Sequence, residues 1–265
     1  MITGLAAALW LSAAPVELEH DLRWELPVTA GLGAWWMLSE FVFKEELAPR
    51  DCKWCARNGF DDAVARAIGA PLDRQKNAAL ASDFIGIGLT PALMLGTSLV
   101  FSLREDATWR QAALDVFFIL QAMVASQALN QAVKFLAGRE RPLVAALPAS
   151  EKHMTAEPED NNLSFFSGHT AYTFSLVAAT ATVLRARGYE RWWLAIVIGA
   201  PLAATTAVLR MVADKHYLTD VLTGIALGTI FGIGVPTIFH RPVKVGEVTA
   251  WLTPGLGGVS LNGKW

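Results

Sequence analysis

The sequence has few charged residues and no basic tract. Asp, Glu, Lys and Arg make up 17% of the 265 residues, whereas hydrophobic residues make up 53%. Without a basic tract or an aromatic-basic stripe, nothing in the sequence indicates nucleic-acid binding. The apolar residues gather in runs of nearly membrane-spanning length, and the mean hydropathy is +0.36. These features are typical of an integral membrane protein.

Cysteine is also scarce, and the two cysteines form a single C-x-x-C, Cys52 and Cys55. A redox motif of this kind needs a thioredoxin-like strand and helix around it, and neither is predicted here. A metal site would need further ligands, and there is no second pair. We therefore expect a local disulfide in an oxidising compartment, with two reduced thiols as the alternative, and no part in the chemistry in either state.

Six apolar segments are predicted to cross the membrane as helices. An even number of spans returns the chain to the side on which it started. The predicted fold class is all-α: a six-span transmembrane helix bundle with an interfacial amphipathic helix and a short irregular C-terminal tail. The six segments are 27–43, 84–103, 112–135, 166–184, 192–209 and 218–239.

The chain divides into three predicted regions. Residues 1–26 form an N-terminal segment with a short apolar run and a small-residue exit, which suits a cleaved signal peptide, but no Lys or Arg precedes that run. Cleavage and an uncleaved cytoplasmic segment therefore both stay open. Residues 27–240 form the membrane domain. Residues 241–265 form a glycine-rich tail, which suggests a short hairpin and has no function that we can assign.

One piece of the polar stretch after the first span is amphipathic. In FDDAVARAIGAPL the apolar residues Phe60, Val64, Ala67 and Ile68 share one helical face. We interpret this piece as a helix that lies in the membrane interface. A small helix packed on the loops is the alternative.

Two patterns within the predicted spans concern packing. Polar side chains are costly in lipid, so those of the third span are expected to face the bundle. Glycines four residues apart in the last span allow close helix packing, which we expect here more than a dimer interface. The polar residues are Asp115, Gln121, Gln127, Asn130 and Gln131, and the glycines are Gly224, Gly228 and Gly232.

Three short motifs carry the candidate chemistry, and all three fall on one face of the predicted bundle. They are KFLAGRERP with Lys134, Arg141 and Pro142; FSGH with Ser167, Gly168 and His169; and LRMVADKHYLTD with Arg210, His216 and Asp220.

The second motif lies where an apolar helix is predicted to begin. The first N–H groups of a helix have no internal partners and lie at the positive end of its dipole, so Ser167 and Gly168 are placed to bind a phosphate. If the segment from His216 is helical, Asp220 lies on the same face and can hold one ring nitrogen, leaving the other free as a base or nucleophile. Lys134, Arg141 and Arg210 would bring three cations to the same phosphate.

Taken together, these motifs resemble the type 2 phosphatidic acid phosphatase superfamily, which also contains the vanadium-dependent haloperoxidases. The signature of that superfamily is K-x6-RP, then PSGH, then SR-x5-H-x3-D. This chain has every charged position in the right order, and it departs only at Phe166, where the family usually has Pro, and at Leu209, where it usually has Ser. The missing serine hydroxyl removes one hydrogen bond to phosphate, worth about 0.5 to 1.5 kcal/mol.

The resemblance implies a two-step phosphoryl transfer without metal or cofactor. His216, oriented by Asp220, would attack phosphorus, and His169 would protonate the leaving oxygen. The phosphoryl oxygens would be held by Lys134, Arg141, Ser167, Gly168 and Arg210. Three cations in one pocket would also repel a metal ion, which argues against zinc at the two histidines.

A bilayer-anchored lipid phosphate is the partner that this placement favours, because the motifs lie at the ends of apolar spans. Undecaprenyl pyrophosphate, phosphatidic acid and phosphatidylglycerol phosphate all satisfy that geometry, and the sequence does not choose among them. The alternatives are a membrane protein that binds or transports a lipid phosphate without hydrolysis, and a vanadate-dependent haloperoxidase. No nucleic acid and no required protein partner is indicated.

The distribution of basic residues predicts which face the motifs occupy. The loops on the other side of the bundle carry Arg104, Arg110 and Arg185, among others, and the positive-inside rule assigns them to the cytoplasm. The motifs would then face the periplasm from a bacterial-type inner membrane. The stretch 44–82 is also rich in Lys and Arg and would lie outside, which conflicts with this assignment.

Overall fold

The computed structural model describes residues 15–105, 107–240 and, in the tail, residues 243–245, 248–255 and 258–264. The apolar run that suggests a signal peptide, in residues 1–14, lies outside the described residues.

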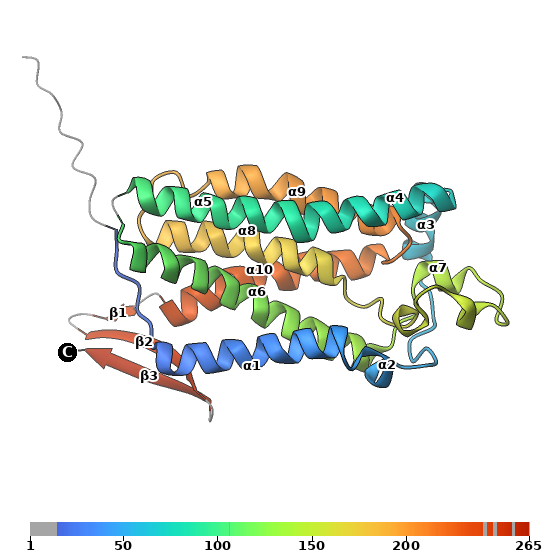
Figure 1. The fold of residues 1–265 in the computed structure, drawn as a ribbon, viewed down its shortest axis with the longest axis horizontal. Coiled ribbons are helices and arrows are strands. Elements are labelled where there is room, and N and C mark those ends of the chain that lie inside the picture. Colours follow the sequence, from blue (N-terminus) through green and yellow to red (C-terminus); the bar gives the residue numbers. More distant parts are fainter. Residues whose placement is uncertain (1–14, 106, 241–242, 246–247, 256–257, 265) are drawn as a thin grey trace, which may run out of the picture.

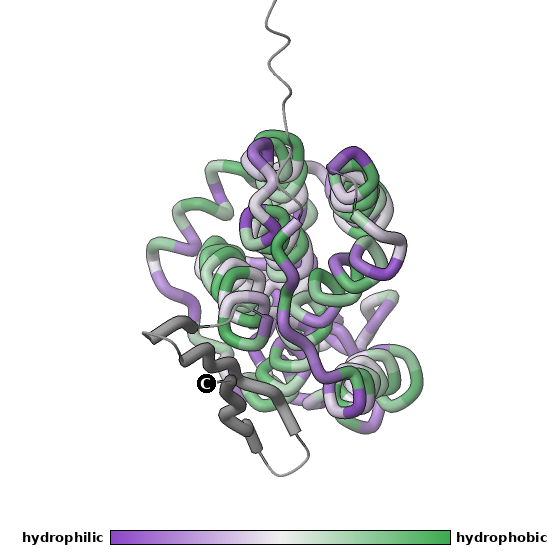
Figure 2. The backbone as a smooth tube through the Cα atoms, turned by 90° about the vertical axis from the view of Figure 1, so that its left-hand side faces the viewer, coloured by the Kyte–Doolittle hydropathy of each residue, from purple (hydrophilic) through white to green (hydrophobic). Residues whose placement is uncertain are grey.

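A bundle of long helices that run roughly side by side makes up most of the molecule (Figure 1). The helix α8 lies inside it and contacts α5, α6, α9 and α10, with the most extensive packing against α10. Seen from the end that carries the sheet, apolar residues predominate along the helices (Figure 2). The long helices are α1 (Leu22–Phe41), α4 (Leu72–Asp83), α5 (Thr90–Arg104), α6 (Trp109–Ala137), α8 (Gly168–Ala186), α9 (Leu194–Val212) and α10 (Leu218–His240).

Four helical segments among the described residues are long and apolar enough to cross a membrane, and they make the chain a multi-pass membrane protein. They are Leu72–Arg104, Trp109–Ala137, Leu194–Val212 and Leu218–His240. The predicted count of six is not confirmed, because α1 and α8 do not reach that level of hydropathy. For α8 the reason is its position: a helix enclosed by four others needs no apolar surface for lipid.

The second predicted span begins earlier than its apolar residues indicate. Helix α4 continues through a π-helical stretch, η1 (Phe84–Leu89), directly into α5. The sequence of α4, LDRQKNAALASD, is polar but rich in good helix formers such as Ala, Leu, Arg, Gln and Lys, so the helix extends beyond the apolar part. Hydropathy alone therefore placed its start twelve residues too late, at Phe84 instead of Leu72.

The short helices and motif-bearing loops gather at one end of the bundle, on the right in Figure 1. Next to them a disulfide joins Cys52 and Cys55, as predicted. The backbone N–H groups of Lys53 and Trp54, inside this disulfide loop, both donate to the carbonyl of Gly138. The short elements are α2 (Lys44–Leu47), α3 (Gly59–Ile68), α7 (Pro142–Ala145), η2 (Lys152–Met154) and η3 (Pro158–Asp160).

The predicted amphipathic piece forms α3, but its contacts differ from those expected. The side chains of Asp61, Val64, Ala65 and Ile68 face the segment between α9 and α10. Phe60, assigned to the apolar face, is 58% exposed. The face of α3 that packs on the protein is therefore not the predicted apolar face: it includes Asp61 and leaves out Phe60. The reason is that α3 covers the loop between α9 and α10.

The bundle is all-helical, as predicted, but the C-terminal tail is a three-stranded antiparallel sheet, so the prediction of an irregular tail was wrong. Its strands are β1 (Val243–Val245), β2 (Val248–Gly255) and β3 (Gly258–Lys264), in the order β1-β2-β3. The suggested hairpin is β2–β3, with Leu252 opposite Leu261. Val, Thr and Trp favour β-strands, and their preference outweighs that of the glycines on which the prediction of an irregular tail was based. The sheet lies at the end of the bundle opposite the motifs (Figure 1).

Both packing predictions are confirmed. Asp115, Gln121, Gln127, Asn130 and Gln131 are all buried within the bundle. The three glycines of α10 lie against α8: a Cβ atom on them would come within 2.8 Å of the Ser167 carbonyl oxygen, 2.5 Å of that of Ala171 and 2.6 Å of that of Ser175, in chain order from Gly224 to Gly232. Glycine is thus needed for these two backbones to lie this close.

Candidate active site

The start of α8 forms a bare helix N-terminus at the motif end of the bundle. Ser167 occupies the N-cap position, but its side chain makes no capping bond; its hydroxyl pairs with that of Thr170, 2.9 Å away. The N–H groups of the first turn, beginning at Gly168, have no acceptor within the helix. The N–H of Ser167 donates to the carbonyl of Asp220 at 3.1 Å, which ties the second motif to the third.

Helix α6 holds this turn from behind. The Asn130 side-chain amide donates to the carbonyl of Phe166 at 2.7 Å. A Cβ atom on Gly168 would come within 2.8 Å of Asn130 Oδ1 and 3.4 Å of Lys134 Nζ. Only glycine therefore fits at position 168, and the Lys134 ammonium lies directly beside the helix N-terminus.

His216 is buried, with 3% of its surface exposed. Its Nδ1 lies 2.7 Å from the carbonyl oxygen of Ser164. A carbonyl can only accept, so Nδ1 carries the hydrogen and Nε2 keeps a free lone pair. Asp214, with φ of 50°, makes the tight turn between α9 and α10 that presents this histidine.

Three cationic side chains, Arg210, Arg141 and Lys134, lie close enough to His216 to affect its charge. Burial, followed by the charges of Arg210, Arg141 and Lys134, lowers the pKa of His216 well below its usual range. The imidazole is therefore neutral at pH 7. The Nε atoms of Arg141 and Arg210 are buried and have no hydrogen-bond partner among the described residues, so both guanidinium groups keep donors for an anion.

Asp220 does not orient His216 in the predicted way. His216 precedes α10, which begins at Leu218, so the two side chains are not one turn apart on a helix. The closest approach of Asp220 Oδ2 to His216 Nδ1 is 3.9 Å. Instead, Asp220 Oδ2 accepts from the Ser164 hydroxyl at 2.6 Å and from the N–H of Tyr217 at 2.9 Å. Asp220 thus acts on His216 through Ser164 and through the start of α10.

His169 has a carboxylate partner that the sequence did not reveal. Its Nε2 lies 2.8 Å from Asp83 Oδ1, at the end of α4. A carboxylate accepts, so Nε2 carries the hydrogen and Nδ1 is the nitrogen left to exchange a proton. Arg210 Nη1 also approaches Asp83 Oδ1, at 3.3 Å. Sequence spacing could not reveal this partner, because Asp83 lies 86 residues earlier in the chain.

One cation of the site, Arg141, is held by the acidic residue Asp160 at its edge. Arg141 Nη1 lies 3.0 Å from Asp160 Oδ2, and Lys44 pairs with the other oxygen of Asp160 at 2.9 Å. Burial would raise the pKa of Asp160, but Arg141 and Lys44 outweigh it and hold the pKa well below its usual range. A permanently ionised Asp160 fixes the guanidinium of Arg141 in place.

The structure thus places all eight predicted site residues at one end of the bundle, around the N-termini of α8 and α10. The residues that sequence reasoning missed are Asp61, Asp83, Asn130, Arg139 and Ser164. Only Arg139 lay within a recognised motif, at a position that the signature leaves free. No group of three or more His, Cys, Asp or Glu residues in the described part of the chain could hold a metal ion.

The sequence profile of the PAP2 superfamily matches residues 115–244, which include all three motifs. The chain belongs to this PAP2 superfamily, the type 2 phosphatidic acid phosphatases that its motifs resemble. Among curated proteins no sequence matches this chain. A structural match is the crystal structure of a transmembrane PAP2 type phosphatidylglycerolphosphate phosphatase from Bacillus subtilis, at 18% identity and a TM-score of 0.48, covering 80% of this chain and 92% of that one.

Within the PAP2 superfamily, this chain's two departures from the signature meet different surroundings. Phe166, in place of the usual Pro, is fully buried, and Asn130 binds its carbonyl oxygen. The turn before Ser167 is therefore fixed by packing and one hydrogen bond. Leu209, in place of Ser, is followed by Arg210, whose Nη1 donates to Ser82 at 3.2 Å and so finds a hydroxyl on α4. Family membership and the arrangement of these residues support a membrane phosphatase.

Proposed function

We propose that this PAP2 protein hydrolyses a lipid phosphate or pyrophosphate through a phosphohistidine intermediate on His216. The observation that carries the proposal is the state of His216: a neutral imidazole whose Nδ1–H is bound to the Ser164 carbonyl and whose Nε2 is free, beside three cations. A nucleophile needs this tautomer, and a phosphoryl group needs these charges.

In the first step, His216 Nε2 attacks phosphorus and the bond to the leaving oxygen breaks. Lys134, Arg141 and Arg210, together with Ser167 and the Gly168 amide, hold the phosphoryl oxygens as charge spreads over them. The Ser164 carbonyl stabilises the cationic phosphoimidazole through Nδ1–H. This role for a backbone carbonyl takes over what the sequence had assigned to the Asp220 carboxylate.

His169 is the proton donor to the leaving oxygen. Its Nε2–H stays bound to Asp83, and Nδ1 takes up a proton from solvent, so that the imidazolium gives this Nδ1 proton to the leaving oxygen and becomes neutral. In the second step the same nitrogen accepts a proton from the water that attacks the phosphohistidine. Free phosphate and the neutral His216 result, and no metal or cofactor takes part in either step.

The substrate class follows from where the site lies. The motifs are at the ends of apolar helices, so a tail can stay in the bilayer while its phosphate reaches the helix N-termini. Phosphatidic acid, phosphatidylglycerol phosphate and undecaprenyl pyrophosphate are the proposed candidates. We place the site on the periplasmic face of a bacterial-type inner membrane, from the basic loops at the opposite end and from the disulfide near the site.

The test is phosphate release and intermediate trapping with purified protein in detergent. The wild type should release phosphate from at least one of the three lipids, and His216→Ala should lose both turnover and acid-labile phosphate on the protein. His169→Ala should turn over lipid slowly but still form a phosphoenzyme with p-nitrophenyl phosphate, whose leaving group needs little protonation. A phosphoenzyme on His216→Ala but none on His169→Ala would reverse the two roles. Binding of all three lipids without hydrolysis would refute the enzyme proposal.

A further inference from the structure

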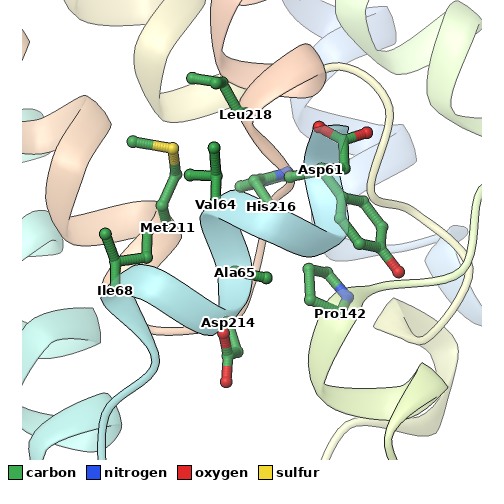
Figure 3. A pocket seen from close by; sticks show the side chains of 10 residues that line it. Asp61, Val64, Ala65, Ile68, Pro142, Met211, Asp214, His216 and Leu218 are labelled. Atoms are coloured by element: carbon green, nitrogen blue, oxygen red, sulfur yellow. The ribbon is translucent and has the colours of Figure 1, made fainter. Parts of the chain in front are cut away.

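Helix α3 carries a buried carboxylate that has no part in the steps above. Asp61 is 1% exposed, although it lies on a short helix at the edge of the bundle. Figure 3 shows α3 lying across the segment that contains His216, with Asp61, Val64 and Ile68 turned towards it. A buried charge of this kind must be fully paired, so its partners show what it holds.

Asp61 caps α10 from another helix. Its Oδ1 accepts from the backbone N–H of Thr219 at 3.0 Å, and its Oδ2 accepts from the Thr219 hydroxyl at 2.7 Å. Thr219 lies in the first turn of α10, where N–H groups lack internal partners and a negative charge is favourable. Burial alone would raise the pKa of Asp61, but the bonds from Thr219 and then Arg139 outweigh it and hold the pKa below its usual range.

Arg139 connects this carboxylate to the site. Its Nη2 donates to Asp61 Oδ2 at 2.7 Å, while its Nη1 donates to Asp220 and, at 2.8 Å, to the hydroxyl of Thr219. The guanidinium lies between the rings of Trp54 and Tyr217, 4.3 Å from each centroid. Five contacts therefore fix a side chain that is 1% exposed.

The backbone of Arg139 reaches the same place by a second route. Its carbonyl accepts from the N–H of Ser164 at 2.9 Å. The Ser164 carbonyl in turn accepts from His216 Nδ1, and the Ser164 hydroxyl donates to Asp220. Arg139 thus fixes both the residue that orients the imidazole and the carboxylate next to it.

We propose that Asp61, acting through Arg139 and Thr219, is a positioning residue for His216. The proposal rests on the proposed function in that it concerns the orientation of that nucleophile. Stability alone does not explain a buried chain of ion pairs, because hydrophobic side chains of similar volume in the same place are often as stable. Its contacts end on Asp220 and Ser164, the two residues that set the geometry of His216.

The principal variant is Asp61→Asn, which keeps the shape of the side chain and removes its charge. Of the two carboxylates that pair with Arg139, only Asp220 is then left, and the start of α10 loses its anionic cap. We expect kcat for the preferred lipid to fall about 10- to 100-fold at unchanged KM, because misplacing a reacting group by about 1 Å costs about 100-fold. The matched control is Asp62→Asn, since Asp62 is partly exposed and its carboxylate pairs, within the described part of the chain, only with Arg57, at 3.5 Å. It should leave kcat unchanged.

A double-mutant cycle separates positioning from general destabilisation. Asp61→Asn and Arg139→Gln act on one chain of contacts, so their combined loss in kcat should be clearly smaller than the product of the single losses. Thr219→Val is the second variant, in case Asp61→Asn does not fold. It removes one bond to Asp61 and one to Arg139 and should lower kcat less than Asp61→Asn, again at unchanged KM.

A second readout does not depend on turnover. Diethylpyrocarbonate modifies a neutral imidazole, and its rate at His216 at pH 7, followed by peptide mass spectrometry, reports how firmly that side chain is held. Asp61→Asn should raise this rate severalfold, and Asp62→Asn should not. If the wild type hydrolyses no lipid but Asp61→Asn still raises the rate, the proposed function fails and the positioning role stands. Unchanged kcat and unchanged labelling in Asp61→Asn would overturn the positioning role.

Discussion

Two glycines of α10 allow a test that separates stability from activity. Gly232→Ala should lower the stability more than Gly224→Ala does, and Gly224→Ala should lower the activity more. A Cβ atom at Gly232 would lie 2.6 Å from the Ser175 carbonyl oxygen and 2.7 Å from the Ala178 Cβ. A Cβ atom at Gly224 would lie 2.8 Å from the Ser167 carbonyl oxygen and 3.1 Å from the Thr170 Cβ. The clash at Gly232 is the tighter, but the clash at Gly224 acts on the turn that is proposed to bind phosphate.

The expected magnitudes follow from overpacking and helix propensity. Overpacking costs about 1 to 3 kcal/mol, and alanine recovers up to about 1 kcal/mol over glycine in a helix. We therefore expect Gly232→Ala to lose about 2 kcal/mol and Gly224→Ala about 1 kcal/mol. In a chain of this size each 1 kcal/mol lowers Tm by about 2 to 4 °C. Gly232→Ala should thus have the lower Tm.

Activity should show the reverse order. To relieve its contact, Gly224→Ala must move the Ser167 turn by several tenths of an ångström, and a shift of about half an ångström should lower kcat about tenfold. Gly232→Ala lies two turns further from the site and should keep kcat per folded molecule within about twofold of wild type.

The assay is a thermal unfolding curve in detergent, followed by tryptophan fluorescence, together with phosphate release per folded molecule. Gly96→Ala is the control, because nothing lies within 4 Å of a Cβ atom there. It should leave both quantities unchanged or raise Tm slightly. Equal kcat in the Gly224 and Gly232 variants would refute the argument that α10 packing sets the phosphate-binding turn.

Three further predictions concern the chemistry. Asp83→Asn should lower kcat about tenfold with lipid and much less with p-nitrophenyl phosphate, since His169 then lacks the carboxylate that supports its proton; equal losses on both would contradict this role. Because the pKa of His216 is depressed, kcat/KM should show no loss near pH 6.5 that is due to protonation of His216. The free energy of unfolding should decrease as the pH falls below about 6.5, because there only the unfolded chain takes up a proton on His216. Exhaustive chelation should leave full activity, and loss restored by a single metal would overturn the metal-free mechanism.

Features that depend on local composition and spacing could be predicted from the sequence. Apolar runs gave a helical membrane bundle, and Cys52 and Cys55 gave a disulfide because three residues are a short enough separation for one. The spacing of Lys134, Arg141, Arg210, His216 and Asp220 gave the family. Boundaries were less well predicted. Polar helix formers extend α4 beyond its apolar part, and a segment that contains Val, Thr and Trp forms a strand in a tail that is also rich in glycine.

How the two histidines are held depends on helix packing and could not be predicted from the sequence. His216 binds a carbonyl 52 residues away and His169 a carboxylate 86 residues away, whereas sequence spacing can suggest only partners within about one helical turn. Asp61, on a helix that looked merely amphipathic, meets Arg139 across 78 residues. No period or motif marks such pairs, because each depends on how separate helices pack, and that packing sets which oxygen each imidazole and each guanidinium can reach.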